Sequence, residues 1–294
     1  MCRCSGLRPP GIATISLTLL TAAFYNPYSV SSGIYWTKRC DLEKQATGYR
    51  IISLGSVDST NAEALRQAAK GASDRTVVVA ETQTAGRGRL DRRWHSPSGT
   101  GLYFSILLRL PHGAAVSLVP LAAGVAVVRA VKRVAGVDAR IKWPNDIHIA
   151  GGWNKVCGIL TEAADNGRVV VVGIGVNVSK WQEPIPEDVA KRRAVTLEDV
   201  SGQPVDHGVL LKAILSDFEN LLEELRRGKS ADIIEAVRDV HEPFGSEVCV
   251  VAAGSETRGI ASGIDDDGRF VLELPDGTRR AFVAGDVELI RPVK

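Results

Sequence analysis

The sequence is short of aromatic residues and of net charge. Phe, Trp and Tyr make up 5% of its 294 residues, and 36 Lys and Arg are nearly balanced by 34 Asp and Glu, which leaves a net charge of +2. A protein dedicated to binding nucleic acid carries a pronounced basic excess, so this balance argues against such a protein. Any site for an anion must therefore be local.

Cysteine is also scarce. Five cysteines, an odd number, are scattered along a chain much too long to need disulfides for its stability. This pattern favours a reducing, cytoplasmic compartment. Cys2 and Cys4 form a C-x-C pair, but no second Cys or His pair stands at the spacing of a zinc finger, so we expect no metal site there.

Residues 1–49 differ in composition from the rest of the chain. Arg3 and Arg8 precede an apolar run over residues 12–24, a pattern that mimics a secretory signal. The run is broken by Thr and Ser, is shorter than the roughly 20 apolar residues of a membrane span, and has no clear small-residue cleavage site. We therefore expect no membrane segment. We interpret residues 1–49 as a disordered extension or as the result of a start codon assigned too far upstream.

From Arg50 onward the apolar residues follow regular periods. Thr60 and Glu63 have the spacing of a capping box, Gly71 and Gly136 are placed to end helices, and an Asn-Gly pair at 166–167 predicts a hairpin. Periodicity predicts strands over residues 51–54, 76–80, 102–110, 140–143, 156–164 and 168–178, and helices over residues 62–70, 115–135, 208–227 and 230–240.

Short apolar runs separated by Gly- and Asp-rich turns follow at near-regular spacing. Such a pattern predicts a small β-barrel, with strands at 248–252, 260–264, 270–274, 280–283 and 287–290. The expected fold class is α+β. We expect a catalytic domain with a mixed sheet over residues 50–242 and a barrel domain over residues 243–294.

The segment over residues 86–94 is dense in glycine and arginine. Glycines allow the backbone to approach a ligand closely, and arginines offer fork-shaped, charge-assisted donors to phosphate or carboxylate. The segment therefore predicts an anion site, although a solvated basic surface loop is the alternative. Its residues with these properties are Gly86, Arg87, Gly88, Arg89, Arg92 and Arg93.

Residues 142–146 read Lys-Trp-Pro-Asn-Asp and follow a predicted strand. Lys142 suits a phosphate, and Asp146 suits Mg²⁺. An ordinary turn is the alternative. Lys155 begins the next apolar strand, where it is either a further cation of the site or an edge-strand lysine that discourages aggregation.

The order and spacing of five segments closely resemble the biotin–protein ligase family, in its monofunctional type without an N-terminal DNA-binding domain. These segments are D-S-T-N at 58–61, Q-T-A-G-R-G-R at 83–89 with Trp94 following, K-W-P-N-D at 142–146, K-V-C-G-I-L-x-E at 155–162 and G-I-G-V-N-V at 173–178. The resemblance is close over residues 52–178 and looser over residues 208–292. It implies a catalytic domain like that of class II synthetases, followed by an SH3-like barrel.

The resemblance also implies roles for individual residues. Lys155, Arg89 and Lys142 would act in catalysis, and Asp146 would hold Mg²⁺. Biotin would be bound by Ser59, Thr60, Asn61, Gln83, Arg87, Gly88, Arg89 and Lys155. The nucleotide would be bound by Gly86, Trp94, Lys142, Asn145 and Asn177.

The implied activity is protein biotinylation with ATP and Mg²⁺. Biotin would be activated to biotinyl-5′-AMP with release of pyrophosphate. It would then be transferred to a lysine of the biotin carboxyl carrier protein or domain of acetyl-CoA carboxylase or a similar enzyme. No nucleic acid or membrane partner is expected, and a homodimer is left open.

Three alternatives compete with this interpretation. A bifunctional ligase and repressor is disfavoured because residues 1–49 contain neither a pair of amphipathic helices nor a basic recognition helix. A lipoate–protein ligase is disfavoured by K-W-P-N-D together with Gln83. A peptide-binding barrel beside an inactive α/β domain is disfavoured by the intact motifs. One departure from the family pattern stands at residues 150–154, a slightly long hairpin with Trp153 and Asn154 where a second basic residue is common.

Overall fold

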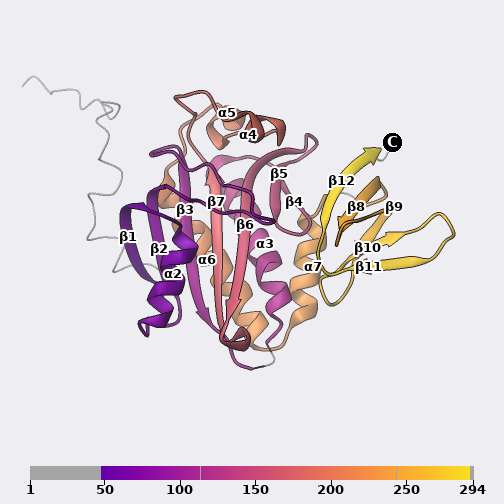
Figure 1. Ribbon diagram of the computed structural model, residues 1–294, viewed down its shortest axis with the longest axis horizontal. Coiled ribbons are helices and arrows are strands. Elements are labelled where there is room, and N and C mark those ends of the chain that lie inside the picture. Colours follow the sequence, from indigo (N-terminus) through magenta and orange to yellow (C-terminus); the bar gives the residue numbers. More distant parts are fainter. Residues whose placement is uncertain (1–47, 113, 243, 292–294) are drawn as a thin grey trace, which may run out of the picture. The chain divides into compact units, whose positions relative to one another are not determined.

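A seven-stranded mixed β-sheet forms the frame of the larger part of the chain (Figure 1). The structure is a computed structural model, and it describes residues 48–112, 114–242 and 244–291. The outer strands β1 and β2 are parallel, and every other neighbouring pair is antiparallel. Across the sheet the order is β1 (Arg50–Val57), β2 (Thr76–Gln83), β3 (Gly101–Arg109), β7 (Val169–Asn177), β6 (Asn154–Ala164), β5 (Asp146–Ile149) and β4 (Ala139–Lys142).

The central strands are buried on both faces. All nine residues of β7 are buried, and so are all but the last residue of β3. The sequences of such strands are continuous apolar runs, because helices cover both faces of the sheet. In Figure 1, α2 (Thr60–Ala69) lies in front of the sheet, while α3 (Val119–Ala135) and α6 (His207–Arg226) lie behind it. Helix α2 contacts β2, β3 and β7, which leaves the front of β6 to other side chains.

Successive residues of β3 serve two separate cores. Leu102 and Phe104 pack in the large core with α3 and α6, whereas Leu107 packs in a smaller core with Ala64 of α2. Helix α3 is largely apolar and ends as predicted at Gly136, whose φ of 69° is favourable for glycine and costly for other residues. The strand and helix types predicted for residues 50–242 are thus confirmed.

The start of α2 differs from the prediction. The helix begins at Thr60 and its N-cap is Ser59, so Thr60 and Glu63 do not form a capping box. The Thr60 hydroxyl instead lies against Gln83, and the Glu63 carboxylate accepts from Arg66 and Gln67. A tertiary contact has replaced the local one that the spacing predicted.

Other differences concern short or terminal pieces. Strand β5 and the five-residue helices α4 (Glu187–Lys191) and α5 (Leu197–Ser201) were not predicted, and the turn at Asn166 is part of a four-residue connection between Ala164 and Val169. Tyr49, assigned above to the N-terminal extension, is buried in the large core. The other predictions for residues 1–47 lie outside the described residues. Within the described ranges, no helix combines the length and apolar character needed to cross a membrane.

The C-terminal strands form a second, five-stranded antiparallel sheet. Its order is β11 (Arg279–Phe282), β10 (Phe270–Glu273), β9 (Ser255–Ile264), β8 (Glu247–Ala252) and β12 (Asp286–Arg291). Helix α7 (Ser230–Val240) precedes this sheet. The α+β class with a second β unit is therefore confirmed.

Aromatic rings join the second sheet to the first. The Trp143 ring stacks on Phe270 at a centroid distance of 5.4 Å, and its Nε1 donates to the Gly268 carbonyl at 3.1 Å. The His241 ring stacks on Phe244 at 4.7 Å and also approaches Phe270. The K-W-P-N-D segment is thereby anchored to the C-terminal sheet through its tryptophan.

We predict that this joint weakens in acid. Burial lowers the pKa of His241 to about 4, although the bond to the Glu242 backbone opposes the shift. Because the folded pKa lies below the unfolded value of about 6.5, the contribution to stability is complete above pH 6.5 and is lost as the pH falls toward 4. A shift of this size corresponds to roughly 3 kcal/mol of unfolding free energy.

Denaturant unfolding at pH 7.5 and pH 5 checks this prediction. The variant His241→Phe keeps a ring for Phe244 to stack on and should lose much of the pH dependence that the unmodified chain shows. The variant must be compared with the unmodified chain because burial also lowers the pKa values of His148 and His207, which add their own pH dependence. An identical change in unfolding free energy for both proteins would contradict a role of His241.

Candidate functional site

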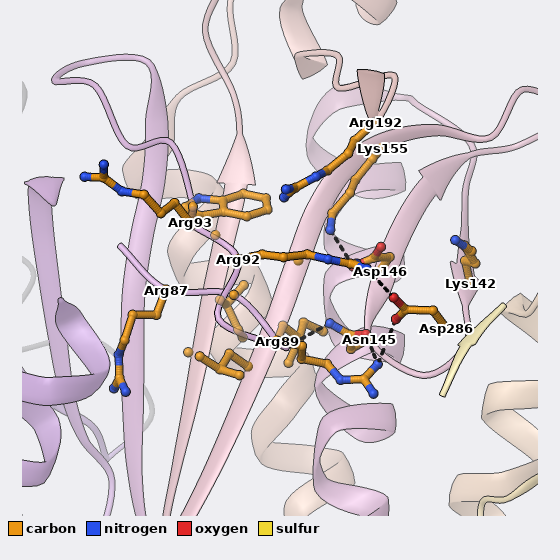
Figure 2. A pocket seen from close by; sticks show the side chains of 18 of the residues that line it. Arg87, Arg89, Arg92, Arg93, Lys142, Asn145, Asp146, Lys155, Arg192 and Asp286 are labelled. Carbon is orange, nitrogen blue, oxygen red and sulfur yellow. Dashed lines mark hydrogen bonds and ion pairs between the residues drawn. The ribbon is translucent and has the colours of Figure 1, made fainter. Parts of the chain in front are cut away.

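A cavity of about 600 Å³ lies between the seven-stranded sheet, the loop over residues 86–94 and strand β12. Nine Arg and Lys side chains line it, against three carboxylates, although the whole chain carries a net charge of only +2. The positive charge is therefore concentrated at one place, as the sequence predicted for an anion site. Figure 2 labels, among the cations of this lining, Arg87, Arg89, Arg92, Arg93, Lys142, Lys155 and Arg192.

Most of the predicted site residues come together here. Two lie apart from the others: Gly86 lines a groove beside the loop, and Asn177 faces a small neighbouring cavity that Trp94 and Lys155 also line. Twelve of the fourteen line the main cavity, namely Ser59, Thr60, Asn61, Gln83, Arg87, Gly88, Arg89, Trp94, Lys142, Asn145, Asp146 and Lys155.

One end of the cavity is a network of uncharged polar groups. The Thr60 amide and hydroxyl both donate to Gln83 Oε1, at 2.8 and 3.2 Å, and Gln83 Nε2 donates to Ser96 Oγ at 2.9 Å. The buried Ser105 hydroxyl lies 2.6 Å from Asn61 Oδ1 and 2.8 Å from Thr60 Oγ1. These contacts fix the orientation of each amide, so the network can present donors and acceptors in defined directions.

The floor of the cavity is bare backbone. Gly158 of β6 and Gly175 of β7 are register partners, and the Trp94 ring lies against both: a Cβ added to either would come within 2.8 and 2.5 Å of it. A Cβ on Gly173 would come within 2.1 Å of Asn61 Oδ1. Glycine is therefore required at all three positions for Trp94 and Asn61 to lie where they do.

The loop over residues 86–94 forms a small hairpin. The Gly88 amide donates to the Arg92 carbonyl at 2.7 Å, and the Trp94 amide donates to the Gly86 carbonyl at 2.9 Å. Leu90 and Asp91 at its tip have φ values of 54° and 56°, and Leu90 is exposed. A glycine-rich, exposed hairpin of this kind can change conformation at low cost.

The arginines of this loop point in two directions (Figure 2). Arg87 pairs with Glu162 at 2.7 Å on one side. Arg89 reaches the other way: its Nη1 donates to Asn145 Oδ1 at 2.9 Å and to the Gly285 carbonyl at 3.2 Å.

Arg92 reaches strand β12 as well. Its Nη2 donates to the Asp286 carboxylate, which also lies 3.8 Å from Arg89. The loop is therefore tied to the C-terminal sheet across the mouth of the cavity. That sheet contributes lining residues 286–289 directly.

A partly buried ion pair lies at the cationic end. Lys155 Nζ donates to Asp146 Oδ1 at 2.6 Å, joining β6 to β5, and the same ammonium lies 5.3 Å from the Trp94 ring centroid. Burial by itself would raise the pKa of Asp146, but the charge of Lys155 outweighs it and holds this pKa below its usual range. The carboxylate is therefore ionised at neutral pH.

Lys142 lies beside this pair. Burial lowers its pKa, although Asp146 opposes the shift. The neighbouring His148 side chain is only 4% exposed. Burial, and to a smaller extent the charge of Lys142, lowers the pKa of His148 to about 3. His148 is thus uncharged at neutral pH.

Sequence analysis missed several lining residues. Trp153 was noted only as a departure from the family pattern. Asp286 and Glu288 alternate along β12 with apolar residues, but no local signal connects that strand to a loop almost two hundred residues earlier. The other missed charged or aromatic residues are His148, Lys191, Arg192 and Arg193. Of these, Arg193 is tied to the site through backbone bonds that pair Lys155 with the segment at 193–195.

The donor set limits what metal could bind. Among the described residues no group of three or more His, Cys, Asp or Glu side chains could hold a metal ion. Mg²⁺, however, often uses one or two carboxylates together with substrate phosphates and water. Asp146 meets that requirement, because Lys155 occupies its Oδ1 while Oδ2 has His148 no closer than 4.0 Å.

Comparison with known proteins agrees with this geometry. Residues 54–179 match the Biotin/lipoate A/B protein ligase family, and residues 244–290 match the Biotin protein ligase C terminal domain. The biotin–(acetyl-CoA-carboxylase) ligase of Paracoccus denitrificans is 34% identical over 80% of this chain and 98% of its own length. The Bifunctional ligase/repressor BirA of Bacillus subtilis is 35% identical over 85% of this chain and 77% of its own length.

A solved structure is also similar. The biotin protein ligase from Aquifex aeolicus, in complex with biotin and ATP, superposes with a TM-score of 0.70 at 30% identity, covering 83% of this chain and 99% of that one. The fold and the cavity thus correspond to the broad class of ligases that attach a carboxylic acid to a protein. Within that class, the chain belongs to the biotin protein ligase family.

We predict that a methyl group on the cavity floor is destabilising. Gly175→Ala places a Cβ 2.5 Å from Trp94 Nε1, so the ring or the strand must shift, at a cost of about 1–3 kcal/mol of unfolding free energy. Gly55→Ala on β1, where nothing lies within 4 Å, is the matched control and should change stability by less than about 0.5 kcal/mol.

A double-mutant cycle assigns this cost to the ring. Adding Trp94→Ala should remove the clash, so the double variant should lose less stability than the sum of the two single variants. Strict additivity in denaturant unfolding would show that Trp94 does not rest on Gly175.

Proposed function

We propose that this chain is an ATP-dependent biotin–protein ligase. It activates biotin to biotinyl-5′-AMP with release of pyrophosphate, and it transfers biotin to a lysine of the biotin carboxyl carrier domain of acetyl-CoA carboxylase or a similar enzyme. The observation that carries this proposal is one cavity with an uncharged hydrogen-bonding end, a backbone floor and a cationic end. The activities named for the relatives and the biotin and ATP in the Aquifex aeolicus structure support it.

The uncharged end suits the ureido head group of biotin. That group is planar and neutral, with two N–H donors and one carbonyl acceptor. Thr60 and Ser96 orient the Gln83 amide, and Ser105 orients Asn61, so the side chains are set before the ligand arrives. Fixed partners reduce the ordering cost of binding.

The cationic end suits the first reaction. A carboxylate oxygen of biotin forms a bond to the α-phosphorus of ATP, and the bond from that phosphorus to the bridging oxygen breaks, releasing pyrophosphate. The reaction brings two anions together, so cations aimed at the reacting groups stabilise its transition state. We assign Arg89 and Lys155 to the carboxylate and α-phosphate and Lys142 to the nucleotide phosphates. Mg²⁺ held by Asp146 would neutralise further phosphate charge.

The loop over residues 86–94 would exclude water. Biotinyl-AMP is a mixed anhydride that water hydrolyses, so its lifetime depends on how well the cavity is covered. Arg89 and Arg92 already join the loop to Gly285 and Asp286, where β12 begins. We assign the closed form of the cavity to this contact between the loop and the C-terminal sheet.

The second reaction joins biotin to the carrier. The lysine amine of the carrier attacks the acyl carbon, an amide bond forms, and AMP leaves with the acyl–phosphate oxygen. We assign no base to this step, because holding the two reactants together can supply much of the acceleration.

The setting and organisation proposed for the enzyme follow the sequence. We propose a cytoplasmic enzyme that uses no nucleic acid or membrane, and free buried Cys157 and Cys249 are consistent with a reducing compartment. We also propose the division at residues 242–243, which the separate sheets support. Light scattering would show whether the protein forms a homodimer.

Biotin-dependent exchange of pyrophosphate into ATP tests the proposal without the carrier. We expect exchange with biotin, and we expect Lys155→Ala to reduce it by about 10²–10³-fold, because a cation at the reacting groups is lost. A thermal-unfolding scan should accompany the assay, since Asp146 loses its ion-pair partner. Exchange supported by lipoate and not by biotin would overturn the substrate assignment, and near-normal exchange by a folded Lys155→Ala would overturn the role of Lys155.

Arg89→Gly should affect the retention of biotinyl-AMP after the intermediate has formed. The substitution removes charge-assisted bonds worth roughly 1.5–3 kcal/mol and frees the loop from Asn145 and Gly285. Biotinyl-AMP should then escape and label bystander lysines while ATP is still consumed. Mass spectrometry of labelled proteins in a mixture measures this, and labelling confined to the natural carrier would contradict the assigned role.

A further inference from the structure

The cations of the cavity differ in what holds them. Lys155 is paired with Asp146, Arg87 with Glu162 and Arg92 with Asp286. Lys142 is held differently: its Nζ lies over the Trp153 ring, 5.3 Å from the centroid. Among the described residues, no carboxylate forms an ion pair with Lys142 within 4.0 Å.

This difference matters for an incoming polyphosphate. A carboxylate partner fixes a cation but also neutralises it, so a phosphate must displace or outcompete that partner. An aromatic face attracts the ammonium through its quadrupole and leaves the full positive charge in place. Lys142 is therefore held beside the cavity by a ring and not by a carboxylate that would cancel its charge.

Trp153 occupies an unusual backbone position for its residue type. It is the last residue of the β5–β6 connection and has a φ of 52°, in the left-handed region where Gly, Asn or Asp is ordinary and a bulky residue is costly. A tryptophan held there at a cost of backbone strain points to a use for its side chain.

A second contact orients the Trp153 ring. His148 packs edge-on against it, with ring centroids 5.8 Å apart and an interplanar angle of 79°. His148 is buried, and its Nδ1 has no hydrogen-bond partner within the described part of the chain. The histidine ring thus packs against Trp153 and restricts the orientation of the indole beside Lys142.

We infer that Trp153 is a positioning residue for the nucleotide. Its ring, supported by His148, holds the Lys142 ammonium toward the cavity without neutralising it, and so sets the affinity for the phosphates of ATP. The inference rests on the proposed function for the identity of the nucleotide. Trp153 acts through Lys142 and does not itself stack on the base.

Direct ATP binding to the full-length protein tests the inference, measured by calorimetry with Mg²⁺ present. Trp153→Leu removes the aromatic face and should weaken ATP binding about three- to thirtyfold, the range expected from partly to fully desolvated cation–π contacts. Trp153→Phe keeps an aromatic face and should recover most of the affinity. Binding of biotin should change less than about twofold in both, which a general loss of structure would not allow.

A matched control is available on the C-terminal sheet. Arg280 lies over the Phe282 ring at 5.1 Å, on strand β11 and outside the cavity lining. Arg280→Leu breaks that contact and should leave the ATP affinity within about twofold of the unmodified protein.

A double-mutant cycle separates positioning from direct contact. In a Lys142→Met background, Trp153→Leu should cost less than about twofold further, because the residue through which Trp153 acts is gone. An undiminished loss in that background would show direct stacking on adenine and would overturn the inference. So would unchanged ATP affinity in Trp153→Leu alone.

Failure of the proposed ligase function can be distinguished from failure of the inference about Trp153. A protein that binds ATP but shows no biotin-dependent pyrophosphate exchange would contradict the ligase reaction, while the cycle on Trp153 and Lys142 would still give its answer. Absence of ATP binding in the unmodified protein would overturn both.

Discussion

Close approach of side chains to bare backbone is the constraint on which the cavity depends. Gly158, Gly173 and Gly175 lie where two central strands meet, and Trp94 and Asn61 rest directly on them. One methyl group at any of the three would occupy space that a ring or an amide now fills. The polar end, the floor and the cationic end can share one cavity because glycine at these three positions leaves room on this face of the sheet.

Charge in the cavity is arranged by pairing and by burial. Most of its cations are held by carboxylates, which prevents their mutual repulsion and orients them before a ligand binds. Each such carboxylate also competes with a substrate anion. The structure therefore combines cations paired with carboxylates and Lys142, whose ammonium lies over an aromatic ring instead. The net charge of the chain reveals none of this, since acidic residues elsewhere cancel the local excess.

Sequence reasoning succeeded where the signal is local. Apolar periods predicted the main strands and helices. The order of the motifs pointed to fourteen site residues, and twelve of these line one cavity. It failed where distant segments meet. Thr60 has the spacing of a local cap, yet its hydroxyl is used by Gln83, and Asp286 enters the site only through the packing of the second sheet. Helix α4 is too short to show a periodic pattern, so Arg192 was missed with it.

The contact between Arg92 and Asp286 joins residues 194 positions apart, and the second of them lies on β12, the last strand of the described residues. At about 5–20 residues per second, a ribosome needs roughly 10–40 seconds to make the intervening chain. During that time the seven-stranded sheet can form, but the wall that β12 supplies does not yet exist. A newly made chain thus passes through a stage in which the arginine loop has no partner strand and the cavity stands open to water. Completion of the cavity therefore has to wait until β12 has been made.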